Sequence, residues 1–159
     1  MSKKKIKRYL KKNKMKIITT LLLLFSSLAI NAQQILKQEK YTGTIDGKIN
    51  ISFYLKIEET GCPSIIASGI YKYTDNKTTN WILLDTTFSE KAQQYTFVEH
   101  YNTGIMLLKR NLETLQGLWI SPDGKKQLKV NLKKIKQSKA EIEKMEDELE
   151  KANYSANDC

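Results

Sequence analysis

Few residues of this sequence stand in an arrangement that could support catalysis. His100 follows Glu99 directly, and neighbouring residues of a strand point to opposite faces, so these two cannot act as an acid–base pair. Glu58 and Glu59 are expected in a turn, where a pair of solvated charges is the plain interpretation. The sequence has neither a G-x-S-x-G nucleophile motif nor a glycine-rich phosphate loop. It therefore predicts a protein that is not an enzyme.

The two cysteines, Cys62 and Cys159, could form a disulfide if the chain is exported. The bridge would enclose 96 residues and would stabilise the fold by about 4–5 kcal/mol through the entropy of the unfolded chain. Because Cys159 is the last residue, two free thiols are the alternative. Two cysteines and the single His100 are too few for a zinc site, which needs about four ligands. We expect no metal and no other cofactor.

Aromatic side chains are the best candidates for ligand contact. Tyrosine combines apolar area with a hydroxyl group, so a set of tyrosines could line the mouth of a barrel or an outer binding face. Aromatic residues on one face of the strands are expected in the core, and those on the other face could lie at such a site. Trp119, if it faces inward, would close one end of a barrel. The candidate ligand-binding residues are Tyr71, Tyr73, Tyr95, Tyr101 and Trp119.

Basic residues concentrate at the N-terminus. The formal net charge is +10, but residues 1–32 hold nine of the 27 Lys and Arg and no acids. The remaining residues have 18 basic and 17 acidic side chains. A nucleic acid is therefore not expected as a partner.

Residues 1–32 have the three parts of a secretory signal peptide. A positive segment precedes the apolar run Ile17–Ile30, and Ala32 offers a small residue at the cleavage point. The apolar run is about 14 residues, shorter than the roughly 20 that a spanning helix needs, so cleavage is favoured over an uncleaved anchor. Translation could begin at Met1 or at Met15. We expect export to the periplasm or the extracellular space, with no membrane span after processing.

Residues 33–135 alternate between short strands and turns. Ile49–Ile57 places apolar residues at every second position, which predicts a strand with one buried face. Asp46 and Gly47 before it predict a tight hairpin. The connections are too short for parallel crossovers, so the sheet must be an antiparallel meander of about eight strands, and closure into an up-and-down barrel removes its edges. The other expected strands are Tyr41–Ile45, Ile65–Tyr73, Trp81–Phe88, Gln94–Tyr101, Ile105–Arg110, Leu115–Ile120 and Gln127–Leu132.

Residues 136–159 form a charged tail that is expected to be helical. Ser138 and Glu141 make a capping box, and Ile142, Met145 and Leu149 form a thin apolar stripe. A lone helix over 138–152 would be marginal in water. Three alternatives stay open: the helix packs on the barrel, pairs with another copy to form a homo-oligomer, or remains a solvated tail.

Three segments carry a resemblance. The segments Tyr41–Ile45, Ser68–Tyr73 and Gln116–Lys126, the last two with Gly two residues before a large aromatic, resemble marker segments of small secreted β-meander proteins of Gram-negative bacteria. Their spacing is also similar to that of avidin-like and lipocalin-like up-and-down barrels. The resemblance covers about 95 residues and implies the fold. It implies no activity and no shared catalytic residue.

These observations lead to three hypotheses about function. The first is an exported, non-enzymatic binding protein that holds a small ligand or presents a sheet face to a partner protein. The second is a periplasmic inhibitor or immunity protein against a lytic enzyme or toxin, since rigid loops can preorganise an interface. The third is a structural protein that assembles through the helix at 138–152.

Overall fold

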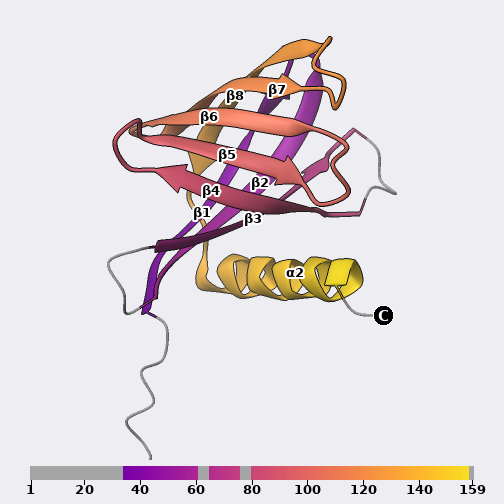
Figure 1. Cartoon of the computed structure of the whole chain (residues 1–159). Helices are drawn as coiled ribbons and strands as arrows, with labels where there is room; N and C mark the ends of the chain where they lie inside the picture. The colour runs from indigo at the N-terminus through magenta and orange to yellow at the C-terminus, as the bar shows by residue number, and fades with distance from the viewer. Residues whose placement is uncertain (1–33, 61–64, 76–79, 158–159) are drawn as a thin grey trace, which may run out of the picture. The chain divides into compact units, whose positions relative to one another are not determined.

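A computed structural model describes residues 34–60, 65–75 and 80–157. The leader at 1–32, Cys62 and Cys159 lie outside these residues, so the export and disulfide predictions fall outside the described structure. Eight strands and one helix, α2, make up the described chain (Figure 1). The strands are β1 (Gln34–Ile45), β2 (Ile49–Glu59), β3 (Ile65–Tyr73), β4 (Ile82–Ser89), β5 (Gln94–Glu99), β6 (Ile105–Asn111), β7 (Thr114–Ile120) and β8 (Gln127–Ile135).

The strands form a closed up-and-down barrel. Each pairs antiparallel with the next, and β1 pairs with β8 from Lys40↔Ile135 to Ile45↔Val130. This confirms the predicted antiparallel meander and its closure. Asp46 and Gly47 have φ of 57° and 68°, the left-handed conformation of the two central residues of a primed turn, and the Lys48 N–H donates to the Ile45 carbonyl at 3.3 Å.

Four strand boundaries differ from the sequence predictions by two residues or more, and the other differences are of one residue. β1 begins at Gln34 rather than Tyr41, and β8 continues to Ile135. β5 ends at Glu99, so Tyr101 lies in the following turn, and Glu58 and Glu59 belong to the end of β2 rather than to a turn. Charged residues in these segments conceal the alternation, and the register shift between Ile35 and Lys37 interrupts it further.

The barrel interior is filled by side chains of alternate strand positions. Phe53 packs edge-on against Phe97, with 5.1 Å between ring centroids, and Tyr95 stacks on Phe97 at 5.5 Å. Gly117 lies where β6 passes closely, and an added Cβ would overlap the carbonyl oxygen of Leu107. The fully buried interior side chains include Tyr41, Ile51, Phe53, Leu55, Tyr71, Phe97, Met106, Leu108 and Leu115.

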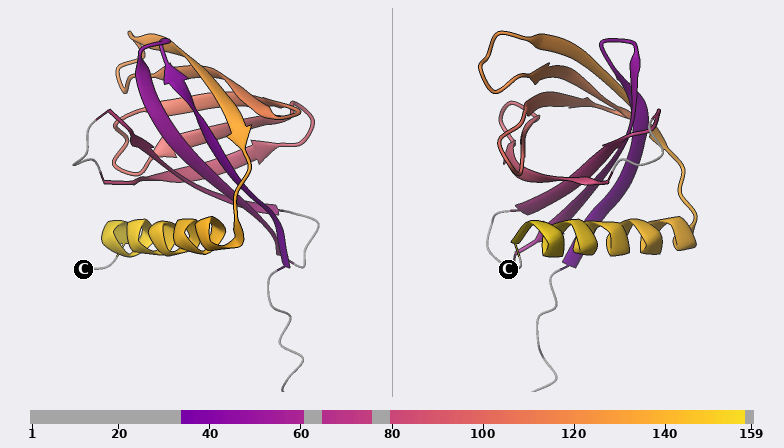
Figure 2. Two further views of the ribbon diagram at one scale, coloured as in Figure 1. Left: turned by 180° about the vertical axis from the view of Figure 1, so that it is seen from behind. Right: turned by 90° about the vertical axis from the view of Figure 1, so that its right-hand side faces the viewer.

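The helix α2 (Lys139–Asn157) packs against the outside of the barrel (Figure 2). Its N-terminus has the predicted capping box, in which the Glu141 N–H donates to Ser138 Oγ at 3.3 Å and the Ser138 N–H donates to the Glu141 carboxylate at 2.8 Å. Met145 and Leu149 are buried against the outward-facing Tyr54 and Ile70. The apolar stripe is therefore used within the chain. Within the described residues, no helix has the length and apolar character needed to cross a membrane.

Candidate functional site

The barrel wall is incomplete between β3 and β4. These strands pair only at Gly69↔Leu84, Ile70↔Leu83 and Tyr71↔Ile82, whereas each of the other ladders has at least five residue pairs. Beyond Gly69, the β3 segment Ile65–Ser68 and the β4 segment 85–89 have no ladder between them. We call this gap the β3–β4 opening.

Backbone polar groups face the β3–β4 opening from both sides. The Thr74 N–H donates to the Asn50 carbonyl of the β2 side, so even-numbered residues of β3 bond toward β2 and odd-numbered ones toward β4. By the same alternation, the His100 N–H donating to the Leu83 carbonyl directs odd-numbered β4 residues toward β5. The backbone groups of Ile65 and Ala67 therefore face those of Thr86 and Phe88 across the opening, with no ladder partner within the described residues.

The barrel interior is less well covered at the β3–β4 opening than elsewhere. Ile65, Ala67, Thr86 and Phe88 point inward yet are half-buried. Their counterparts on the fully paired strands, such as Phe53 and Phe97, are completely buried. The inward-facing side chains along the opening are thus partly exposed to solvent.

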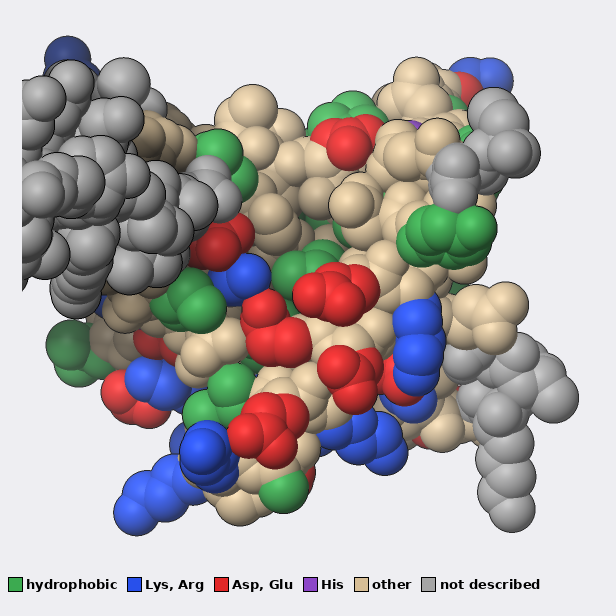
Figure 3. All heavy atoms as spheres, turned by 90° about the horizontal axis from the view of Figure 1, so that it is seen from below, with side chains coloured by type: hydrophobic (Ala, Val, Ile, Leu, Met, Phe, Trp, Pro, Cys, Tyr) green, Lys and Arg blue, Asp and Glu red, His purple; other side chains and the backbone are tan. Residues whose placement is uncertain are grey.

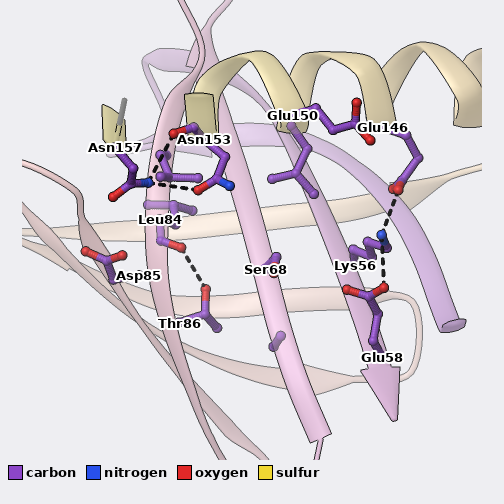
Figure 4. A pocket seen from close by; sticks show the side chains of 13 residues that line it. Lys56, Glu58, Ser68, Leu84, Asp85, Thr86, Glu146, Glu150, Asn153 and Asn157 are labelled. Atoms are coloured by element: carbon purple, nitrogen blue, oxygen red, sulfur yellow. Dashed lines mark hydrogen bonds and ion pairs between the residues drawn. The ribbon is translucent and has the colours of Figure 1, made fainter. Parts of the chain in front are cut away.

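A pocket of about 350 Å³ lies over the β3–β4 opening, beneath the C-terminal half of α2 (Figure 4). Asp85 and Thr86 of β4 border one side of it, and Lys56 and Glu58 of β2 border the other. Successive turns of the helix line the pocket with Glu146, Leu149, Glu150, Asn153 and Asn157.

A charged network fixes α2 at one side of this pocket. Lys56 Nζ lies 2.8 Å from Glu146 Oε2 and 3.0 Å from Glu58 Oε1, and the Tyr54 hydroxyl donates to Glu146. Burial opposes ionisation of Glu146, but the hydrogen bonds from Lys56 and Tyr54 outweigh it and lower the pKa of Glu146. Burial and the hydrogen bond to Glu146 raise the pKa of the Tyr54 hydroxyl, which therefore stays a donor.

The pocket rim is acidic overall. Four carboxylates line it, Glu58, Asp85, Glu146 and Glu150, against the single cation Lys56. Asp85 is largely exposed and lies 3.6 Å from His100 Nδ1. Glu150 is exposed and has no ion-pair partner in the described part of the chain. Seen from below, acidic side chains gather along the face that α2 presents (Figure 3).

Three of the predicted ligand-binding residues surround a buried carboxylate instead of an open mouth. The Tyr71 hydroxyl and Trp119 Nε1 donate to Glu99 Oε1 at 2.5 and 2.8 Å, and the Thr103 hydroxyl donates to Oε2. Tyr73 contacts the Tyr71 hydroxyl at 3.1 Å. Burial and the hydrogen bond to Glu99 raise the pKa of Tyr71. Trp119 is packed against the interior core at this end.

A second buried carboxylate lies at the other end of the barrel. Glu39 binds the Arg110 guanidinium through both oxygens, accepts from the Tyr41 hydroxyl at 2.8 Å and lies 3.2 Å from Lys134 Nζ. Burial opposes its charge, but Arg110 and Tyr41 outweigh burial and lower the pKa of Glu39. Tyr95 lies beside this cluster, with its ring centroid 5.8 Å from the Arg110 guanidinium carbon.

Sequence reasoning missed both carboxylates. The alternation Tyr95-x-Phe97-x-Glu99 was a usable signal, since it places Glu99 on the same face as two core aromatics. Both carboxylates accept hydrogen bonds from side chains of other strands, and these bonds cross-link the strands at the two ends of the barrel.

Tyr101 is separated from the other predicted binding residues. It is 75% exposed, and its ring meets His100 edge-on at 4.9 Å. With Trp81 and Ala152 it lines a second hollow of about 570 Å³ on the opposite side of α2. His100 and Glu99 point in different directions, because His100 contacts the Ala156 carbonyl of α2 at 3.2 Å while Glu99 is inside the barrel.

Comparison with known protein families, curated proteins and solved structures finds no match to this chain. No group of three or more His, Cys, Asp or Glu side chains within the described residues could hold a metal ion. The geometry at the β3–β4 opening is therefore the basis for the function argued below.

Proposed function

We propose that this chain is an exported, non-enzymatic binding protein whose ligand occupies the pocket at the β3–β4 opening. The observation that carries the proposal is the three-pair β3–β4 ladder in an otherwise well-paired barrel. A barrel that served only as a scaffold would gain stability by completing this ladder, since closure removes exposed edges. Here the edges end instead at a pocket whose lining combines apolar side chains of β3, β4 and α2 with charged and amide side chains.

The barrel mouth is a less suitable location for a ligand. Tyr71 is 0% exposed at the Glu99 end of the barrel and Tyr95 is 2% exposed at the Glu39 end, so neither side chain lines an open mouth. At the Glu99 end, the Tyr71 hydroxyl and the Trp119 indole N–H are already engaged with that carboxylate. The pocket beneath α2 has space, free polar groups and access from solvent, the features that ligand sites share.

The proposal includes export because the leader at 1–32 has the composition of a signal peptide. The inhibitor hypothesis stays a prediction. So does assembly through α2, although Met145 and Leu149 already contact the barrel, so another copy would have to use a different face of the helix.

Binding can be tested by following the amide resonances of ¹⁵N-labelled residues 33–159, which contain the whole described core. The probes are palmitate, maltohexaose and a capped hexapeptide of alternating Val and Lys. We expect at least one probe to shift resonances of β3, β4 and α2 around the pocket. Ser68→Trp, which fills the pocket, should abolish these shifts, whereas Gln116→Trp on the exposed outer face of β7 should preserve them. Shifts confined to another surface, or none with any probe, would overturn the proposal.

A further inference from the structure

We propose that the ligand of the β3–β4 opening is an extended, basic polypeptide segment that adds as a strand to the edge of β3. This inference rests on the proposed function and specifies the class of ligand. Strand addition to an exposed sheet edge is a general mode of peptide recognition, in which backbone hydrogen bonds give affinity and alternate side chains give specificity.

The first argument is the pattern of the unpaired backbone groups. Ile65 and Ala67 each direct an N–H and a C=O into the opening, as do Thr86 and Phe88 on the opposite strand. Donors and acceptors at every second residue match another extended main chain. A fatty acid has no such series of donors, and a sugar does not repeat it at this spacing.

The second argument is that this edge lacks the usual protection against pairing. Natural edge strands carry Lys or Pro, a bulge, or a covering segment that prevents association. The segment Ile65–Ser68 has neither charge nor proline, and its pairing with β2 has no register shift. Ile66, on the outer face of this segment, is 44% exposed. Helix α2 crosses above the opening but leaves the pocket of about 350 Å³ between itself and β3, so within the described residues this edge can be reached for pairing.

The third argument is the difference between the two sides that an added strand would meet. Side chains pointing inward would contact Ile65, Ala67 and Phe88, which favour small apolar residues. Side chains pointing outward would reach the rim beneath α2, where Asp85 and Glu150 are exposed. Because side chains of a strand alternate between faces, the preferred ligand alternates apolar with Lys or Arg residues.

The rim also explains why the ligand should be basic rather than neutral. Lys56 is already engaged with Glu58 and Glu146 and leaves no cation for an acidic ligand. Glu150 on α2 has no ion-pair partner among the described residues, and Asp85 on β4, although it lies 3.6 Å from His100 Nδ1, keeps 64% of its side chain exposed. An anionic peptide would meet like charges, and this repulsion contributes to specificity.

The test compares four ligands by isothermal titration with residues 33–159. The first is the capped Val–Lys hexapeptide, the second the same peptide methylated at every backbone nitrogen, the third a Val–Glu hexapeptide and the fourth palmitate. We expect the Val–Lys peptide to bind at least tenfold more tightly than the other three. On binding, amide hydrogen exchange at Ala67 and Thr86 should slow, because these groups gain partners.

The charge argument is tested by a double variant, Asp85→Asn with Glu150→Gln. It should weaken Val–Lys binding by about fivefold and reduce its salt dependence. The matched control Asp147→Asn removes an exposed charge of α2 that does not line the pocket and should leave affinity unchanged.

Equal binding of the methylated peptide would overturn strand addition, and equal binding of the Val–Glu peptide would overturn the charge preference. Binding of palmitate alone in the pocket would overturn the inference while leaving the proposed function standing. A dimer that pairs through the β3 edge without peptide would assign the edge to a second copy and overturn it as well. If no probe reaches the opening, the proposed function fails together with the inference.

Discussion

Trp119 on β7 donates its indole N–H to the buried Glu99 carboxylate on β5, with Nε1 2.8 Å from Oε1. A hydrogen bond to a buried charge is stronger than one between neutral groups, and its loss leaves the acceptor under-satisfied. Trp119→Phe should therefore lower the free energy of unfolding in urea by about 2–3 kcal/mol. Trp81→Phe, at a half-buried position against α2 where no carboxylate accepts, is the control for the lost ring area. Equal losses in the two variants would show that the hydrogen bond contributes nothing.

Gly117 is required because β6 passes over it. An added Cβ would overlap the Leu107 carbonyl, which belongs to the backbone and cannot rotate away. Gly117→Ala should cost about 3 kcal/mol or more in unfolding free energy, or prevent folding. Gly69→Ala is the matched test, since its Cβ would lie 3.4 Å from the nearest atoms, an ordinary contact. It should cost less than about 1 kcal/mol, and a larger loss there than at Gly117 would contradict the explanation.

The packing of α2 should weaken in acid. The folded-state pKa of Glu146 is lowered from 4.5, so its contribution is present above the unfolded-state pKa and is lost as pH falls through the folded value. Lys56, whose pKa is raised, adds stability that is lost only at high pH. Between about pH 6 and pH 3, fluorescence of Trp81 beside α2 should report loosening of the helix. Glu146→Gln should remove most of this pH dependence, and an unchanged profile in that variant would contradict the assignment.

The sequence predicts best where one face of a strand is uniformly apolar. Ile51, Phe53, Leu55 and Ile57 make the buried face of β2 unambiguous, and the capping box at Ser138 locates the start of α2 correctly. The first half of β1 is missed because Glu39 is charged yet points inward, which is possible only because Arg110 is brought to it from a distant strand.

The candidate site could not be predicted in the same way. Alternation shows which face of a strand is buried, but the extent of a ladder depends on where two strands diverge in space. Nothing in Ile65–Tyr73 or Ile82–Ser89 indicates that their ladder ends at Gly69. The contact of α2 with Tyr54 and Ile70 was equally hidden, since an apolar residue on the outer face of a strand has no partner visible in the sequence.

Leu149 anchors α2 to the barrel, and its removal should free the helix without unfolding the barrel. Truncation of a buried leucine costs about 2–5 kcal/mol. A helix that has lost this packing energy is only marginally stable in water, so α2 should unfold or detach. In Leu149→Ala, amides of α2 should exchange rapidly while those of β5–β7 stay protected. Tyr154→Ala, at a position of the same helix that is 69% exposed, is the control and should leave exchange of α2 unchanged. Loss of protection throughout the barrel would show that α2 is part of the folding core.

Replacing Glu39 or Arg110 alone should lower the unfolding free energy far more, per residue replaced, than replacing both together. Glu39→Leu leaves the guanidinium largely buried without its partner, and Arg110→Leu leaves the carboxylate with Lys134 and Tyr41 alone. Each single change should cost about 3–5 kcal/mol in unfolding free energy, because an uncompensated buried charge is more costly than the pair. The double variant replaces both ions by apolar groups and should cost less than the sum of the two single losses by at least about 2 kcal/mol. Additive losses in this cycle would mean that the two side chains stabilise the barrel independently, against the geometry that joins them.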